Sequence, residues 1–358
     1  MRLIVLPGDG IGPEITSATL RLLERMNEMF GLGLTFEQRD IGLESLRRDG
    51  TTCPPSVLEA CRSADGIVLG PISHADYPAP AQGGINVSAA LRIDLDLYAN
   101  IRPSRSRTAL PCWGRTPMDL VIVRENTEGF YSDRNMFKGV GEFMPTEDVA
   151  LSIRKVSVRG SARIARAAFE LAATRRRKVT AVHKVNVLKV SEELFLREVR
   201  SVASQHRDIE YDEQLVDSMA ALLVRDAERF DVVVTTNMFG DILSDEAAEL
   251  SGSLGLAGSI NAGDAHCMAQ AQHGSAPDIA GLDRANPSSL MLSAAWLLDW
   301  LARRHAAPSL ATAARVIENA IDVLLENPST RTADLGGPLG TRAFTDAVCA
   351  QVESHAGR

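Results

Sequence analysis

The sequence predicts an α/β protein built around a mostly parallel sheet. Buried-strand patterns alternate with segments of helical periodicity: a strand over residues 3–6 precedes a helix over 15–30, and strands at 34–37 and 66–70 enclose a short helix. Strands that alternate with helices pair in parallel, because each helix returns the chain to the end of the sheet at which the previous strand began. With 358 residues, the chain is long enough for two domains or one large one.

The later segments continue this alternation. A strand over 119–123 runs into a turn, and residues 131–150 are polar and irregular, which indicates an excursion from the body of the molecule, such as a hairpin arm. The remaining segments are predicted strands at 178–183, 211–216 and 232–235, and predicted helices at 161–173, 191–204, 217 onward, 289–304, 310–327 and 341–354.

Composition narrows the class of partner. A formal net charge of -8 disfavours nucleic acid or an anionic membrane as the main partner. The five cysteines show no CxxC spacing, which fits reduced thiols that serve packing in a cytoplasm. No signal peptide precedes the first strand and no apolar run reaches membrane-spanning length, so we expect a soluble, cytoplasmic protein.

The stretch DVVVTTNMFGDILSDEAAEL (residues 231–250) carries the clearest site signal. Asn237 and Gly240 interrupt a buried strand, and we expect a helix to begin near Asp241. Asp241 and Asp245 are four residues apart and therefore share one helix face. Their carboxylates suit Mg²⁺ or Mn²⁺, although a solvated acidic helix start is the alternative. Asp217 is either a third metal ligand or an N-cap.

Basic residues cluster near the ends of predicted elements. Arg92, Arg102 and Arg124 lie where α/β sheets place their ligands, and a guanidinium group binds a carboxylate through two parallel hydrogen bonds. Each alone is compatible with a solvated charge, but three that converge would bind a substrate with more than one carboxylate. Lys184, close to Asn186 at a strand end, is either catalytic or a solvated charge.

Two glycine-containing loops could contact a cofactor. PGDGIGPE (residues 7–14) joins a strand to a helix, where backbone approaches a phosphate or sugar, although a plain tight turn is the alternative because GxGxG is not the dinucleotide fingerprint. HGSAPDIAG (residues 273–281) can wrap a cofactor, and Asp278 could accept hydrogen bonds from a ribose diol and repel a 2′-phosphate.

Six motifs occur in an order that resembles the β-decarboxylating dehydrogenases, the isopropylmalate/isocitrate dehydrogenase family. They are GDGIGPE (8–14), LDLYANIRP (95–103), RENTEGFY (124–131), KVNVLK (184–189), NMFGDILSD (237–245), and HGSAPDIAG (273–281) with ANP (285–287). The resemblance covers nearly the whole chain. It implies a two-domain fold, distinct from the Rossmann fold, with one domain from residues 1–99 and 252–358. The second domain, from residues 100–251, would carry the arm and form a homodimer with shared active sites.

The resemblance also implies the chemistry: NAD-dependent and Mg²⁺- or Mn²⁺-dependent oxidative decarboxylation of a 3-substituted malate. Lys184 would be the base and Tyr131 the acid. The implied substrate-binding residues are Ser88, Arg92, Arg102, Arg124 and Asn186, and the implied metal ligands are Asp241, Asp245 and, from the other subunit, Asp217. The implied cofactor-binding residues are Ile11, His273, Gly274, Ser275, Ala276, Asp278, Ile279 and Asn286, of which Asp278 and Ile279 match the pair that selects NAD.

The substrate is the least determined part of this prediction. The sequence favours 3-isopropylmalate through its HGSAP motif, with isocitrate or tartrate and D-malate as alternatives. Isopropylmalate enzymes place leucines where this chain has Ser88 and Ala89, whereas isocitrate enzymes place serine and asparagine where it has Asn86 and Ser88, the same pair in reversed order. Gln270 replaces a glutamate of the family. A regulatory subunit without activity is a further alternative, but Lys184, Tyr131 and the three aspartates are all present.

Overall fold

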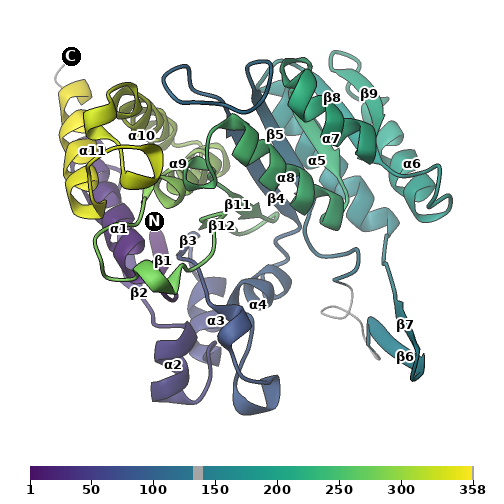
Figure 1. The fold of residues 1–358 in the computed structure, drawn as a ribbon, viewed down its shortest axis with the longest axis horizontal. Coiled ribbons are helices and arrows are strands. Elements are labelled where there is room, and N and C mark those ends of the chain that lie inside the picture. The colour runs from purple at the N-terminus through teal and green to yellow at the C-terminus, as the bar shows by residue number, and fades with distance from the viewer. Residues whose placement is uncertain (132–139, 357–358) are drawn as a thin grey trace.

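A ten-stranded sheet forms the centre of the computed structural model, which describes residues 1–131 and 140–356 (Figure 1). Its order is β2-β1-β3-β12-β11-β4-β5-β10-β8-β9. The strands are β1 (Arg2–Leu6), β2 (Thr35–Gln38), β3 (Gly66–Leu69), β4 (Ala99–Arg105), β5 (Asp119–Glu125), β8 (Lys178–His183), β9 (Glu210–Leu215), β10 (Val232–Thr235), β11 (Ile260–Ala262) and β12 (Cys267–Gln270).

Two parallel blocks make up this sheet. One contains β2, β1, β3 and β12, the other β5, β10, β8 and β9. Antiparallel pairing of β11 with β12 and β4, and of β4 with β5, joins the blocks. The predicted mostly parallel α/β sheet is therefore confirmed, and the predicted division at residues 99 and 252 remains a prediction, because the sheet runs through both parts.

Helices cover both faces of the sheet (Figure 1). The longer ones are α1 (Gly12–Phe30), α5 (Val158–Ala173), α6 (Ser191–Ala203), α7 (Val216–Arg225), α8 (Asn237–Ser251), α9 (Ser288–His305), α10 (Pro308–Glu326) and α11 (Thr341–Ala356), and the short ones are α2 (Gly42–Asp49), α3 (Pro55–Arg62) and α4 (Val87–Asp94). Helix α1 illustrates how local residues determine where a helix begins and ends. Pro13 lies in its first turn, and Gly31, with φ of 57°, ends it by donating its N–H to Asn27 O.

The apolar core is continuous on one face of the sheet and divided on the other. On the first face, Leu3, Val68, Val121 and Val232 share a cluster with α1, α5 and α9. On the second face, one cluster packs β1 and β3 against α3 and α4, and another packs β5 and β10 against α7 and α8. Burial of these apolar surfaces is the main stabilising contribution to the fold.

A polar stripe crosses the second face between its two apolar clusters. Side chains alternate between faces along a strand, and the register pairs Asn100 with both Asn261 and Arg124. Arg102 lies two residues from Asn100 along β4, and Gln270 lies two residues along β12 from a buried member of the cluster that packs against α3 and α4. Both side chains therefore lie on the second face as well. Strands β11 and β12, which supply Asn261 and Gln270, were not predicted from the sequence.

The predicted start of α8 was wrong by about one turn. The helix begins at Asn237, so Asn237 and Gly240 lie inside it, and its first turn holds no acidic residue. Gly240 does not end a strand; it permits close packing, since a Cβ there would lie 2.6 Å from Arg124 Cβ. The alternative of an acidic helix start stabilised by the helix dipole is therefore excluded.

The predicted excursion contains a hairpin, β6 (Glu142–Thr146) and β7 (Val149–Ser152), which projects away from the body (Figure 1). Residues 132–139 of that excursion lie outside the described residues. All five cysteines are free, and four are buried. None of the described helices combines the length and apolarity needed to cross a membrane.

Candidate active site

A cavity of about 370 Å³ lies over the polar stripe, between α4 and α8. Its lining includes eight residues predicted from the sequence: Ser88, Arg92, Arg102, Arg124, Tyr131 and Asp241, with His273 and Gly274 of the second loop. Segments from α4, β4, β5, α8 and the second loop therefore meet at one place. The predicted convergence of the three arginines is thus seen in the structure.

Arg124 is anchored by α8. It is 3% exposed, its Nε and Nη2 donate to Asn237 Oδ1 at 3.0 and 2.6 Å, and its Nη1 is paired with Asp241 Oδ1. Asn237, whose Nδ2 donates to Glu128 O at 3.0 Å, is thereby held between β5 and the turn that follows it. The guanidinium group lies 5.9 Å from the ring centroid of Tyr131, within cation–π range.

Arg102 connects both aspartates of α8. Its Nη1 lies 3.0 Å from Asp245 Oδ1 and 3.3 Å from Asp241 Oδ1, and its Nε donates to Asn100 Oδ1 at 2.6 Å. Burial, aided by the nearby charge of Arg124, lowers the pKa of Arg102 to about 10 against the opposing effect of the two carboxylates. The group remains a cation at neutral pH, so the cavity retains its positive charge.

Gln270 organises the side of the cavity formed by α4. Its Oε1 accepts hydrogen bonds from Ser88 Oγ at 3.0 Å, Asn261 Nδ2 at 3.2 Å and Arg92 Nη2 at 3.3 Å. Asn86 caps α4, since its side chain accepts from Ala89 N at 3.0 Å. The neutral amide of Gln270 therefore holds Ser88 and Arg92, two predicted substrate-binding residues. The sequence showed that Gln270 replaces a glutamate of the family but did not indicate this role.

Gln272 and His273 each have a buried polar atom without a hydrogen-bond partner among the described residues. Gln272 Nε2 donates to Asp245 Oδ1 at 2.8 Å, but its buried Oε1 has no partner among the described residues. His273 Nε2 is likewise buried without a partner there, and burial lowers the pKa of His273. Buried polar atoms without partners are costly, and at the rim of a cavity they are suited to a ligand.

A second cluster of predicted residues lies apart from the cavity lining. Lys184 Nζ is 2.5 Å from Asp217 Oδ1, and this hydrogen bond lowers the pKa of Asp217. Asn186, also predicted, is exposed two residues further on. Within the described part of the chain, no three acidic, histidine or cysteine side chains gather closely enough to hold a metal, so the predicted trio is not assembled by one chain.

The two glycine-containing loops contact each other directly. Ile11 N donates to Ser275 O at 2.8 Å, and a Cβ on Gly10 would lie 2.0 Å from that same oxygen, which explains the glycine. Ser275 Oγ lies 2.7 Å from Ser73 Oγ. The backbone groups of Ile11 and Ser275 therefore join the two glycine-containing loops.

Beyond this junction the second loop is open. Asp278 is exposed in the short 3-10 turn Pro277–Ile279, whereas Ala276 has a positive φ of 37° and Ile279 packs partly against the core. Asn286 is held by Asp334, whose Oδ2 accepts from Asn286 Nδ2 at 2.9 Å. Asp334 and Gln272 were missed because nothing in their local sequence marks them, whereas Asn237 lies in the stretch that signals the site but was predicted only to interrupt the strand.

The side chains of the candidate site fit the divalent cation and the dinucleotide that the family resemblance implies. Asp241 and Asp245 offer carboxylate oxygens one helical turn apart, with side chains 37% and 54% exposed, and oxygen donors suit a hard divalent cation. The exposed Asp278 carboxylate and the unsatisfied His273 Nε2 suit the hydroxyl and amide groups of a dinucleotide.

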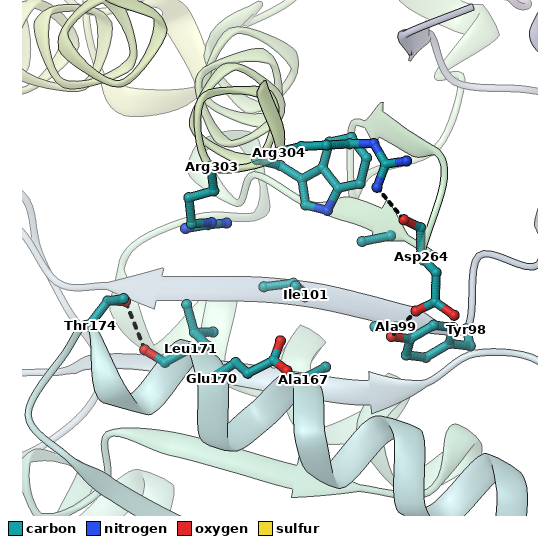
Figure 2. A pocket seen from close by; sticks show the side chains of 13 residues that line it. Tyr98, Ala99, Ile101, Ala167, Glu170, Leu171, Thr174, Asp264, Arg303 and Arg304 are labelled. Carbon is teal, nitrogen blue, oxygen red and sulfur yellow. Dashed lines mark hydrogen bonds between the residues drawn. The ribbon is translucent and has the colours of Figure 1, made fainter. Parts of the chain in front are cut away.

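A second cavity, of about 460 Å³, lies on the opposite face of β4 (Figure 2). Ala99 and Ile101 form its floor between α5 and α9, and none of the predicted site residues lines it. Several of its polar groups bind one another: Tyr98 OH donates to Asp264 Oδ1 at 2.9 Å, and Arg304 donates to Asp264 O. The two faces of one strand thus border two different cavities, and the predicted chemistry lies on one of them.

Comparisons with known proteins identify the family of this chain. A family model described as isocitrate/isopropylmalate dehydrogenase matches residues 2–348. The isocitrate/homoisocitrate dehydrogenase of Thermus thermophilus is 42% identical over 355 residues, covering 99% of each chain. The 3-isopropylmalate dehydrogenase of Saccharolobus solfataricus is 37% identical over 348 residues, covering 97% of this chain and 98% of the relative.

A solved structure is similar along the same length. The isocitrate dehydrogenase from Methylococcus capsulatus superposes with a TM-score of 0.85 at 37% identity, covering 98% of this chain and 99% of the other. These comparisons identify the chain as a β-decarboxylating dehydrogenase that acts on a hydroxy acid. The chain belongs to the isocitrate/isopropylmalate dehydrogenase family.

Proposed function

We propose that this protein uses NAD and a divalent cation, Mg²⁺ or Mn²⁺, to decarboxylate oxidatively a malate that carries a polar substituent on C3. The main support is the convergence of Arg92, Arg102 and Arg124 with Asp241 at one cavity, beside Asp245. Three guanidinium groups match a substrate with several carboxylates, and the aspartates match a cation that such a substrate would chelate.

The polar lining next to α4 supports the choice of substituent. Ser88 and Asn86 face the cavity with His74, and Ser88 is hydrogen-bonded to Gln270. An isopropyl group would remove these polar groups from water without replacing their hydrogen bonds, which costs binding energy. Our proposal therefore moves from 3-isopropylmalate, which the sequence favours, to isocitrate, homoisocitrate or tartrate; the name of the Thermus relative is consistent with the first two.

We also propose a homodimer in which each cavity is completed by the other subunit. Lys184 and Asp217 form a cluster outside the cavity lining of their own chain. Apolar side chains near the Lys184–Asp217 cluster and on α8 are exposed: Val187 at 65%, Val190 at 86% and Ile242 at 60%. An exposed apolar surface of this kind marks an interface, and two-fold symmetry would place Lys184 of the partner subunit at each cavity.

The reaction then assigns one task to each side chain. The arginines hold the carboxylates, and Lys184 of the partner subunit accepts the proton of the C2 hydroxyl. Tyr131, which lines the cavity beside Arg124, donates a proton to C3 after carbon dioxide leaves. When bound, the dinucleotide supplies the hydride acceptor and the cation supplies Lewis acidity at the C2 oxygen.

A steady-state panel tests this proposal. The purified chain is assayed for NADH formation with Mn²⁺ and 3-isopropylmalate, isocitrate, homoisocitrate, tartrate or D-malate, with NADP as the parallel cofactor. We expect kcat/KM for a polar-substituted acid to exceed that for 3-isopropylmalate by about 10-fold or more. A preference for 3-isopropylmalate would overturn the choice of substituent, and failure to turn over any of these acids would favour a regulatory subunit.

A further inference from the structure

A buried ion pair lies outside the catalytic cavity. The Glu192 side chain is fully buried and that of Arg154 is 9% exposed, and the carboxylate Oε1 is paired with Arg154 Nη2. Neither residue lines the cavity. A buried pair contributes little net stability, because desolvation of the two charges offsets their attraction. Such a pair is better explained by what it holds in place.

One side of the pair holds the backbone of Lys184. Glu192 Oε2 accepts the Lys184 N–H at 2.7 Å. The Lys184 carbonyl accepts from Val187 N at 3.0 Å and Leu188 N at 2.9 Å, and Glu192 N in turn donates to Leu188 O at 3.0 Å. The turn between β8 and α6 is thus closed by hydrogen bonds at both ends, which fixes the point from which the Lys184 side chain extends.

The other side of the pair holds the start of α8. Arg154 Nη2 also donates to Thr236 Oγ1 at 2.8 Å, and Nη1 donates to Ser191 Oγ at 3.0 Å. Thr236 is the N-cap of α8, the helix that carries Asp241 and Asp245. The guanidinium group further lies 5.4 Å from the ring centroid of Phe239 in the first turn of that helix.

We propose that Glu192 and Arg154 are positioning residues that keep Lys184 and the first turn of α8 in one fixed relation. This inference rests on the proposed function, in which Lys184 accepts a proton. In the proposed dimer, Lys184 serves the cavity of the other subunit while α8 serves its own. The pair therefore links the two active sites through a rigid, buried contact.

Three variants test the link: Glu192→Gln, Arg154→Met and the double variant. Each single change leaves one buried polar partner uncompensated, and we expect kcat to fall about 10- to 100-fold with KM changed by less than about 3-fold, since small displacements of a reacting group have effects of this size. In the double variant the introduced amide can still accept the Lys184 N–H and no buried charge remains. We therefore expect its kcat to be no lower than that of the weaker single variant, because the two changes break the same link.

Glu193→Gln is the matched control. Glu193 occupies the next position of α6, its side chain is 52% exposed, and it pairs with Arg200 at 2.9 Å. The same change of charge there should leave kcat within about 2-fold, because an exposed ion pair contributes little.

A second measurement separates positioning from general stability. Acetic anhydride acetylates accessible lysine amines, so the extent of labelling at Lys184, read by mass spectrometry with the exposed Lys189 as internal reference, reports whether its amine is still held by Asp217. We expect labelling of Lys184 to increase in Glu192→Gln and to be unchanged in Glu193→Gln. The inference is overturned if the single variants lower only the melting temperature, with kcat and Lys184 labelling unchanged. It is likewise overturned if the double variant loses the product of the two single losses. A wild-type chain that oxidises none of the hydroxy acids contradicts the proposed function instead, and the labelling profile is still readable.

Discussion

At the scale of single residues, Asp241 is the point where the cavity's charges meet. Its Oδ1 pairs with Arg124 and lies 3.3 Å from Arg102 Nη1. The same carboxylate is a proposed ligand for the divalent cation. It must therefore balance buried positive charge and also offer an oxygen to the cation. A neutral amide could offer an oxygen but could not balance the positive charge.

Asp241→Asn should therefore abolish the response to metal together with turnover. We expect kcat/KM to fall by about 100-fold or more, the size of loss seen when one key electrostatic group is removed from an active site. NADH formation titrated with Mn²⁺ measures both effects. Asp322→Asn is the control, because Asp322 also binds two arginines, Arg105 and Arg107, at another place. Wild-type metal dependence in Asp241→Asn would show that the metal assignment is wrong.

At the scale of elements, the close packing of α8 against β5 determines where the aspartates lie. Gly240 is the contact point, and it allows Arg124 to pass beneath the helix and reach Asn237. Helical glycine normally destabilises by about 1 kcal/mol relative to alanine. Here a Cβ would lie 2.6 Å from both Arg124 Cβ and Cγ, so the ordinary preference is reversed.

Gly240→Ala should consequently destabilise the protein by about 1–3 kcal/mol, as overpacking does, and raise KM because Arg124 is displaced. Thermal unfolding and substrate titration check the two effects. An increase in melting temperature, which helix propensity alone predicts, would contradict this interpretation of the packing.

At the scale of the whole molecule, the buried His183 and the half-buried His273 make stability depend on pH. Burial lowers the pKa of His183 and of His273 from the usual 6.5. Between that value and the lowered ones, the unfolded chain binds more protons than the folded one, so the free energy of unfolding decreases as pH falls. Above about pH 6.5 both histidines are neutral in either state, and this contribution to the pH dependence vanishes.

His183→Asn should flatten this dependence. His183 Nδ1 accepts the Val185 N–H at 3.2 Å, and an asparagine oxygen could accept that hydrogen bond without titrating. Melting temperatures between about pH 5 and 8 would show a smaller slope than in the wild type. An unchanged slope would show that His183 contributes no such linkage.

The proposed dimer makes a further prediction at this scale. Asp217→Asn and Asp241→Asn homodimers should each be nearly inactive, since each cavity needs one aspartate from each chain. A mixed dimer has one intact site, so subunit exchange should restore about one quarter of wild-type activity when half of the dimers are mixed. Size-exclusion chromatography confirms the dimers. No recovery after verified exchange would contradict shared sites.

Much of the fold was predictable, because the hydrophobic periodicity of its longer segments is a local property. The strand at β8 was predicted at its observed residues, and α9, α10 and α11 within about two residues at their starts. The short strands β11 and β12 were missed because three or four residues are too few for a period to show. The start of α8 was misjudged because a glycine in a helix has the same local signature as one in a turn.

What the sequence determined by itself is the α/β class and, through the order of its motifs, the family and the residues that could carry chemistry. Only the tertiary structure decided which of these residues meet: Asp241 lines one cavity with three arginines and pairs with two of them, whereas Lys184 and Asp217 form a cluster outside that cavity lining. It also revealed the contacts of Asn237 and Gln270, which the sequence had marked without a role, and those of Gln272, Asp334 and the buried pair of Glu192 and Arg154. The physical reason is that periodicity and turn chemistry act between neighbours in the chain, whereas hydrogen bonds and charges act between neighbours in space.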